Sequence, residues 1–217
     1  MCSSDLMSSG LLIERVTLLG TTWPLQWLAW PVTAAWLVGV TNAFNLIDGV
    51  DGLAAGIVSV AGAACAAILV MRGHTPEAML LTAFVGAYLG FLRFNFAPAS
   101  IFLGDGGSLL AGFLLASTAI TGWQKGATAL ATAVPLLLFA VPIADSAFAL
   151  LRRSLARPAD GRTLMATLHQ IAQPDRAHIH HRLLALGWSA RRTVIILYAV
   201  TAILSLLALA TADVTAP

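Results

Sequence analysis

The sequence has 217 residues, of which 59% are hydrophobic and only 10% are charged, with a formal net charge of +2. A soluble domain carries about 25% charged residues, so this composition excludes an ordinary soluble protein and predicts an integral membrane protein of one domain. No nucleic-acid partner is expected, and the two cysteines, Cys2 and Cys65, predict neither a disulfide framework nor a zinc site.

Six apolar stretches are long enough to cross a bilayer as helices. They are residues 25–43, 53–71, 78–96, 109–123, 127–150 and 194–212. We therefore predict an all-α, polytopic membrane protein with about six transmembrane helices and with its function in the polar loops. Residues 1–24 are expected to form a leader and an external or interfacial segment, and residues 25–217 the transmembrane domain.

Basic residues indicate the orientation of these helices. Most of them fall in one loop, between the fifth and sixth apolar stretches: Arg152, Arg153, Arg157, Arg162, Arg176, Arg182, Arg191 and Arg192. The positive-inside rule places this loop in the cytoplasm. Because successive helices alternate in direction, the loops around Asp48 and Asp105 should lie on the same side, so three polar loops are predicted to share the cytoplasmic face.

The first polar loop contains Asn45, Asp48 and Asp51 at intervals of three residues. A helical or 3₁₀ path would bring their oxygens to one side, and oxygen ligands suit Mg²⁺. Gly49 and Gly52 indicate a turn at this point. The alternative is a solvated turn in which Asp51 caps the next helix.

The second polar loop leads into the fourth helix with the sequence GDGGS at residues 104–108. Glycines let backbone N–H groups approach an anion, and an aspartate beside them can hold a metal that bridges phosphate oxygens. The loop is a candidate diphosphate cradle, unless Asp105 or Ser108 merely caps the helix. Asn95 lies just upstream, near the end of the third helix.

The third polar loop holds three histidines within four positions, His178, His180 and His181, flanked by Arg176 and Arg182. Imidazole and guanidinium groups can donate hydrogen bonds to phosphate oxygens. A zinc site is the rival interpretation, but no cysteine or HExxH pattern supports it. A histidine-rich helix lying on anionic lipid is the other alternative.

Two further polar groups are expected to have non-catalytic roles. Asp145 is expected to pair with Arg152 or Arg153, with lining of the site as its second role. A basic and aromatic group before the sixth helix is assigned to membrane anchoring: Trp188, Arg191 and Arg192.

Together these motifs resemble the polyprenyl-phosphate N-acetylhexosamine-1-phosphate transferase family, bacterial enzymes that start O-antigen, enterobacterial common antigen or teichoic-acid linkage synthesis. The resemblance spans Leu11 to Ala212, and the matching stretches are NAFNLIDGVDGLAAG, RFNFAPASIFLGDGGSLLAGF, PIADSAF and PDRAHIHHRLLALG. The related phospho-MurNAc-pentapeptide translocases typically carry a triple-histidine motif, so HIHHRLL favours the N-acetylhexosamine branch.

The resemblance implies transfer of a sugar 1-phosphate, with GlcNAc-1-phosphate expected, from a UDP-N-acetylhexosamine to undecaprenyl or another polyprenyl phosphate. It implies Mg²⁺, with Mn²⁺ as the alternative, a site on the cytoplasmic face of the bacterial inner membrane, contact with membrane lipid, and a homodimer. By resemblance the metal ligands are Asp105 and Asp48, the catalytic residues are Asp48, Asp51, Asp105, His178 and His181, and the substrate-binding residues are Asn45, Asn95, Arg176, His180 and Arg182.

One feature departs from the family. Its members usually begin with more membrane helices and carry an Asp-Asp pair in an early cytoplasmic loop, and nothing before Asn42 supplies that pair. We therefore expect an N-terminally truncated product that is inactive alone. The competing functions are a relative that binds polyprenyl phosphate without catalysis and, more distantly, a transporter, which would need charged or broken-helix positions near the bilayer midplane.

Overall fold

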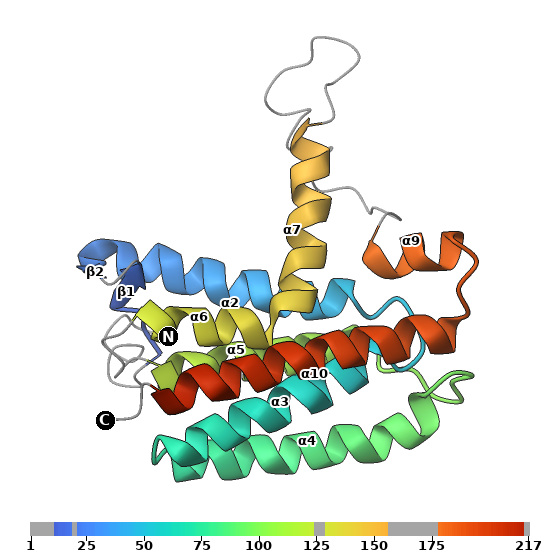
Figure 1. The fold of residues 1–217 in the computed structure, drawn as a ribbon, viewed down its shortest axis with the longest axis horizontal. Coiled ribbons are helices and arrows are strands. Elements are labelled where there is room, and N and C mark those ends of the chain that lie inside the picture. Colours follow the sequence, from blue (N-terminus) through green and yellow to red (C-terminus); the bar gives the residue numbers. More distant parts are fainter. Residues whose placement is uncertain (1–10, 19–20, 124–128, 156–177, 215–217) are drawn as a thin grey trace.

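The computed structural model describes residues 11–18, 21–123, 129–155 and 178–214, and it is built almost wholly from helices (Figure 1). Before the first long helix come two strands and a short 3₁₀ helix: β1 (Arg15–Leu18), β2 (Thr21–Pro24) and η1 (Gln26–Leu28). The helices are α2 (Ala29–Leu46), α3 (Leu53–Met71), α4 (Thr75–Asn95), α5 (Gly104–Trp123), α6 (Ala129–Leu138), α7 (Ala140–Leu155), α9 (Ile179–Ala185) and α10 (Ala190–Val214). The predicted all-α membrane fold is confirmed.

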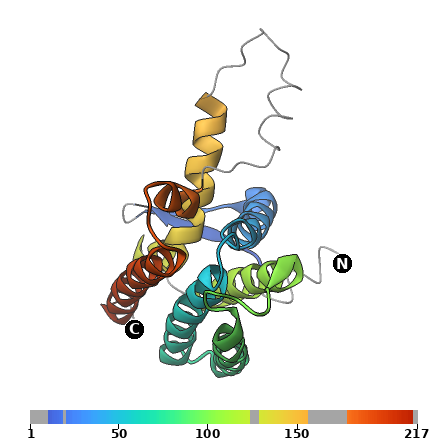
Figure 2. The same cartoon turned by 90° about the vertical axis from the view of Figure 1, so that its right-hand side faces the viewer.

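Helix α3 forms the centre of the bundle, with α4, α5, α6 and α10 packed around it (Figure 2). Its sequence is rich in alanine and glycine, and small residues let apolar helices approach closely. At Gly56 the approach is so close that an added Cβ would overlap the ring of Tyr198 on α10. The ring occupies this space, and its hydroxyl donates a hydrogen bond to the carbonyl oxygen of Gly52.

Three of the described helices are long and apolar enough to cross a membrane: Leu53–Met71, Thr75–Asn95 and Ala190–Ala212. The predicted count of about six crossings stays a prediction. Helices α2 and α5 cover the first and fourth predicted stretches and lie alongside these three in the bundle (Figure 1).

The prediction of a single helix over the fifth stretch, residues 127–150, was wrong. This stretch divides into α6 and α7, and α7 turns away from the bundle (Figures 1 and 2). Pro135 lies inside α6 and Pro142 in the first turn of α7. Proline has no N–H and its ring clashes with the preceding turn of a helix, so two prolines around Phe139 favour a break there.

The segment before α2 forms a two-stranded antiparallel hairpin, which the sequence did not predict. Its strands pair Arg15 with Pro24 and Leu18 with Thr21. Nearby, the backbone N–H of Ile13 donates a 2.8 Å hydrogen bond to Thr33 Oγ1 on α2. The hairpin lies at the end of the bundle opposite α9 (Figure 1), so it does not take part in the polar site described below.

Candidate active site at the polar end of the bundle

The predicted convergence of three polar loops at one end of the bundle is confirmed by contacts between them. Asn45, in the last turn of α2, donates from Nδ2 to Asp105 Oδ1 at 3.0 Å and to Ser108 Oγ at 2.9 Å. The third loop joins the first where His180 packs directly over Gly49. Residues from the three motifs therefore lie in one site, although 60 positions separate Asn45 from Asp105.

Asp105 and Ser108 lie in the first turn and a half of α5. Ser108 is buried, and its hydroxyl donates to the carbonyl oxygen of Gly104 at 3.1 Å while accepting from Asn45. A capping side chain accepts hydrogen bonds from the backbone N–H groups of the first turn, whereas Ser108 donates to a carbonyl oxygen of that turn. Ser108 therefore does not cap α5, which was the alternative to a role in the diphosphate cradle. Asp105 is exposed at the surface of the site, where a ligand can reach its carboxylate.

Asp48 is half-buried beside this group. Burial, followed by the negative charge of Asp105, raises the pKa of Asp48 to about 6. Two carboxylates that repel each other at the edge of a membrane are stabilised by a divalent cation between or beside them. The donor set therefore fits the predicted metal ligands, Asp48 and Asp105.

The described residues do not form a complete metal cage. Among them, no group of three or more His, Cys, Asp or Glu side chains is arranged to hold one ion. Mg²⁺ commonly binds through one or two carboxylates and takes its other oxygens from water and substrate phosphates. Two carboxylates are therefore sufficient for a Mg²⁺ ion that takes its remaining ligands from water and a bound phosphate.

The raised pKa of Asp48 gives a prediction for stability. The folded protein holds this proton up to a pH of about 6, whereas the unfolded chain releases it near 3.8. Stability is therefore lost as the pH rises from about 4 to about 6, the opposite of a salt-bridged aspartate. We expect Asp48→Asn to melt at a higher temperature than the parent at pH 7.5 in EDTA, and the difference to shrink as the pH falls through this window.

Thermal unfolding in detergent, with and without Mg²⁺, measures this difference. Mg²⁺ should raise the melting temperature of the parent more than that of Asp48→Asn, since the variant has lost the charge that the cation neutralises. A variant that melts below the parent at pH 7.5 in EDTA would contradict the assignment of Asp48 as a repelled carboxylate.

Asp51 and Asn95 shape the loop between α4 and α5. Asp51 Oδ2 accepts a 2.9 Å hydrogen bond from the backbone N–H of Ala99. The Asn95 side chain, 3% exposed, accepts from Gly52 N at 3.1 Å and donates to the carbonyl oxygen of Ile101 at 2.9 Å. The capping role considered for Asp51 does not match these bonds, because its carboxylate binds Ala99 in another loop and the N-cap residue of α3 is Gly52, with no side-chain capping bond. The substrate contact predicted for Asn95 stays a prediction.

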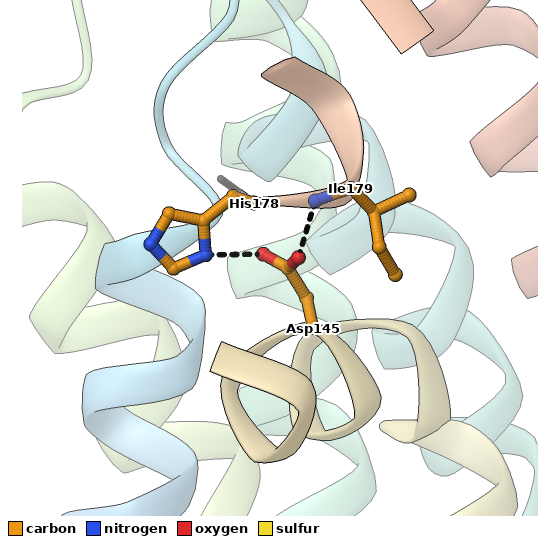
Figure 3. A network of polar contacts seen from close by, with 3 residues as sticks. All are labelled: Asp145, His178 and Ile179. Atoms are coloured by element: carbon orange, nitrogen blue, oxygen red, sulfur yellow. Dashed lines mark hydrogen bonds and ion pairs between the residues drawn. The ribbon is translucent and has the colours of Figure 1, made fainter. Parts of the chain in front are cut away.

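The histidine motif forms the start of α9. His178 is 5% exposed and pairs through Nδ1 with Asp145 Oδ2 on α7 at 2.9 Å (Figure 3). Asp145 therefore takes the second of the two roles considered for it, contact with the site. His181 is half-buried and Arg182 is exposed, whereas the predicted substrate ligand Arg176 lies outside the described residues.

His180 is the most deeply buried of the three histidines, with 1% of its surface exposed. Its ring lies parallel to that of His178 with 5.8 Å between centroids, and tilted against His181 at 4.3 Å. Burial, followed by the neighbouring His181, lowers the pKa of His180 to about 4. His180 is therefore neutral at pH 7, and the substrate contact predicted for it stays a prediction.

Arginines at the start of α10 hold the neighbouring loop. Arg191 Nε donates a 2.8 Å hydrogen bond to the carbonyl oxygen of Ala97, and the guanidinium of Arg192 lies 4.6 Å from the centroid of the Trp188 ring. The membrane-anchoring role predicted for these residues stays a prediction. Arg191 has in addition a structural role, because it ties α10 to the loop that Asp51 and Asn95 shape.

Tyr88 was not predicted as a residue of the site, and contact with the site was only the second of the two roles considered for Asp145. Tyr88, on α4, donates from its hydroxyl to the carbonyl oxygen of Gly107 at 2.7 Å and so supports the GDGGS turn. Asp145 was assigned to an arginine pair, although its stretch PIADSAF is one of the four that carry the family resemblance. That match was the signal that could have placed Asp145 in the site.

Comparison with known proteins supports a relationship over most of the chain. Residues 4–123 match the family described as glycosyl transferase family 4. The match begins inside the segment 1–24 that was expected to precede the transferase domain, and it covers the first two polar loops.

Individual relatives extend the match beyond this region. The chain is 39% identical over 207 residues to a protein of Bacillus subtilis (strain 168) named probable undecaprenyl-phosphate N-acetylglucosaminyl 1-phosphate transferase, covering 94% of the chain and 54% of that relative. It is 38% identical over 186 residues to decaprenyl-phosphate N-acetylglucosaminephosphotransferase of Mycobacterium tuberculosis (strain ATCC 25618 / H37Rv), covering 77% and 43%.

A second group of relatives matches a shorter region. Phospho-N-acetylmuramoyl-pentapeptide-transferase of Limosilactobacillus fermentum (strain NBRC 3956 / LMG 18251) is 45% identical over 85 residues, 39% of the chain and 27% of the relative. The chain spans about half the length of the curated relatives it matches first.

Proposed function

We propose that this chain, which belongs to glycosyl transferase family 4, carries the reaction site of a membrane enzyme that transfers a sugar 1-phosphate from a UDP-sugar to polyprenyl phosphate. The products are UMP and a lipid-linked diphosphate sugar. The observation that carries the proposal is the contact of Asn45 with Asp105 and Ser108, which assembles the acidic motifs at the end of the bundle where the histidine motif also lies.

The chemistry requires two anionic phosphates to approach each other. Asp48 and Asp105 would hold Mg²⁺, or Mn²⁺ as the alternative, and the ion would neutralise charge on the diphosphate of the nucleotide sugar. Asn45 orients the Asp105 carboxylate by donating to it. Asp51 fixes the backbone of the loop between α4 and α5 through Ala99, and it keeps its predicted catalytic role as part of this proposal.

The histidine motif supplies donors on the other side of the site. His181 would donate to phosphate oxygens, and Arg182, with Arg176, would add guanidinium groups for the diphosphate. His178 would contact the substrate through Nε2. His180 supports the pair by stacking against both neighbouring rings. Asn95 and Gly52 fix the loop that faces Asp51.

We further propose that the site lies on the cytoplasmic face of the bacterial inner membrane, where a UDP-sugar is present and the phosphate of a polyprenyl lipid reaches the surface. UDP-GlcNAc is the expected donor, because the Bacillus subtilis and Mycobacterium tuberculosis relatives are named for N-acetylglucosaminyl phosphate transfer. Residues 25–217 would form the transferase domain, in contact with membrane lipid and in a homodimer.

The proposal predicts Mg²⁺-dependent release of UMP from UDP-GlcNAc by membranes that contain the protein and undecaprenyl phosphate. Two preparations are compared: the 217-residue chain, and the product of the same reading frame extended upstream. Release that needs both the lipid phosphate and the metal supports the transferase, and omission of either is the control.

The two preparations also test the expectation that this chain alone is inactive. Release by the extended product only would confirm that expectation. Release by both would show that the early Asp-Asp pair is dispensable. Retained binding of UDP-GlcNAc without UMP release in either preparation would replace the transferase with a relative that binds its ligands without catalysis.

A further inference from the structure

Asp145 joins two segments that lie 33 positions apart in the sequence. It is 2% exposed, and its Oδ2 lies 2.9 Å from His178 Nδ1. Its Oδ1 accepts a 2.6 Å hydrogen bond from the backbone N–H of Ile179, the first residue of α9 (Figure 3). Both carboxylate oxygens therefore bind adjacent residues at the start of the histidine-bearing helix.

The geometry determines which nitrogen of His178 carries a proton. Ile179 N–H donates to Oδ1, and an ionised carboxylate only accepts, so an ionised Asp145 assigns the proton of the Oδ2–Nδ1 contact to His178 Nδ1. The neutral ring then has its lone pair on Nε2, which lies on the side of the ring away from Asp145 (Figure 3). Carboxylates that fix an imidazole in this way set both its tautomer and its orientation.

The same carboxylate also completes the start of α9. His178 is the N-cap residue of α9, and it makes no side-chain capping hydrogen bond. The first N–H of a helix needs an acceptor when it is buried, and Asp145 provides that acceptor from another helix. The position of α9 therefore depends on Asp145, and α9 carries His180, His181 and Arg182.

We propose that Asp145 is a positioning residue of the active site. It holds His178 as the Nδ1–H tautomer, so that the lone pair of Nε2 is free to accept a hydrogen bond from a protonated group of the substrate, and it fixes the start of α9 through Ile179. The inference rests on the proposed function, in which His178 contacts the substrate. Because Asp145 lies on α7, the turn between α6 and α7 is what brings this carboxylate to the histidine motif.

The sharpest test replaces Asp145 with asparagine. The backbone N–H of Ile179 can only donate, so the amide oxygen of the new side chain must face it, and the amide N–H₂ must then face His178. Nδ1 of His178 would have to become an acceptor, which shifts its proton to Nε2. We expect ¹⁵N NMR of the histidine-labelled chain in lipid bilayers to show the Nδ1–H tautomer in the parent and the Nε2–H tautomer in Asp145→Asn.

The signals of His178 are identified as those missing from His178→Gln. Resonances of His74, at the start of α4, report whether each variant keeps its fold. If His178 stays protonated on Nδ1 in Asp145→Asn, the positioning role is wrong. This measurement needs no turnover, so its result stands whether or not the protein releases UMP.

Kinetics give the second readout, in whichever of the two preparations is active. We expect Asp145→Asn to lower kcat for UMP release by about 10–100-fold, with a smaller change in KM for UDP-GlcNAc. In the His178→Gln background the same substitution should change kcat by less than about twofold, since its effect passes through His178. Independent, multiplying losses would show that Asp145 serves only the fold, and would overturn the inference.

Ser146 provides the matched control. It is the next residue on α7, and its hydroxyl has no hydrogen-bond partner among the residues that the structure describes. Ser146→Ala should leave kcat within about twofold of the parent and the His178 tautomer unchanged. An equal loss of kcat in Ser146→Ala would attribute the effect to α7 packing and contradict a specific role for Asp145. Absence of UMP release in both preparations would refute the proposed function instead.

Discussion

Asp105→Asn is expected to reduce Mg²⁺-dependent UMP release by at least about 1,000-fold. A metal ion at a phosphoryl-transfer site contributes several kcal/mol of stabilisation to the developing charge, and about 1.4 kcal/mol corresponds to a tenfold change in rate. Asp105 is the exposed carboxylate of the pair and therefore the one that an incoming metal–nucleotide complex can reach. The asparagine keeps the shape of the side chain and removes only its charge.

Two observations in addition to turnover make this prediction specific. Asp105→Asn removes one of the two causes that raise the pKa of Asp48, the charge of Asp105. The pKa of Asp48 should therefore fall in the variant, which can be followed by the pH dependence of thermal unfolding in EDTA. A variant with lost turnover and an unchanged pH dependence would indicate that the two carboxylates do not interact.

Glu77→Gln is the matched control for Asp105→Asn. Each residue is an acidic side chain in the first turn of a long helix, Glu77 in α4 and Asp105 in α5. Helix α4 begins at the opposite end of the bundle from the polar loops (Figure 1), and Glu77 is in its first turn. Its neutralisation should leave turnover within about twofold of the parent. Equal losses in the two variants would show that charge at a helix start, rather than a metal site, underlies the effect.

Much of the site could be predicted from the sequence, because the side of the membrane on which a loop lies follows from the number of crossings before it. Once helices cross a bilayer in alternation, every second loop lies on the same side, so Asn45, Asp105 and His180 were expected together. The prediction holds although the fifth predicted stretch is broken between α6 and α7. The break changes the path of one predicted crossing only, and it leaves the ends of α2, α3, α4 and α5 in place. The first two polar loops come from these ends, and the histidine motif lies between α7 and α10.

The individual partners could not be predicted in the same way. Asn95 and Asp51 both have side chains suited to substrate, yet they bind the backbone of Gly52 and Ala99. A loop of irregular backbone needs acceptors and donors for its own N–H and C=O groups, and the sequence does not show which polar side chains meet that need. The same limit applies to Asp145, whose partner His178 lies beyond a long intervening segment.

The packing of α3 against α10 gives the second large effect. Gly56→Ala is expected to lower the free energy of unfolding by about 2 kcal/mol, because the new Cβ would overlap the Tyr198 ring. Forcing an extra methyl group into a packed interior costs about 1–3 kcal/mol or more, and the better helix propensity of alanine offsets about 1 kcal/mol of that loss. For a protein of this length the melting temperature should fall by about 4–8 °C in detergent.

The displaced ring would also affect the polar end of the bundle. The Tyr198 hydroxyl donates to the carbonyl oxygen of Gly52, and the N–H of Gly52 is in turn held by Asn95. Moving Tyr198 therefore loosens the turn that follows Asp51, so Gly56→Ala should lower turnover as well as stability. This link is how a packing change inside the bundle reaches the loop that carries the carboxylates.

Two comparisons separate this steric explanation from a general intolerance of alanine. Gly86, on α4, has no atom of the described residues within 4 Å of an added Cβ, so Gly86→Ala should be neutral or stabilising by up to about 1 kcal/mol. In a Tyr198→Ala background the overlap is removed, and Gly56→Ala should then have little further effect on the melting temperature. If Gly56→Ala lowers the melting temperature equally in both backgrounds, contact with Tyr198 is not the cause. Any loss of turnover would then have to arise without displacement of Tyr198 from Gly52.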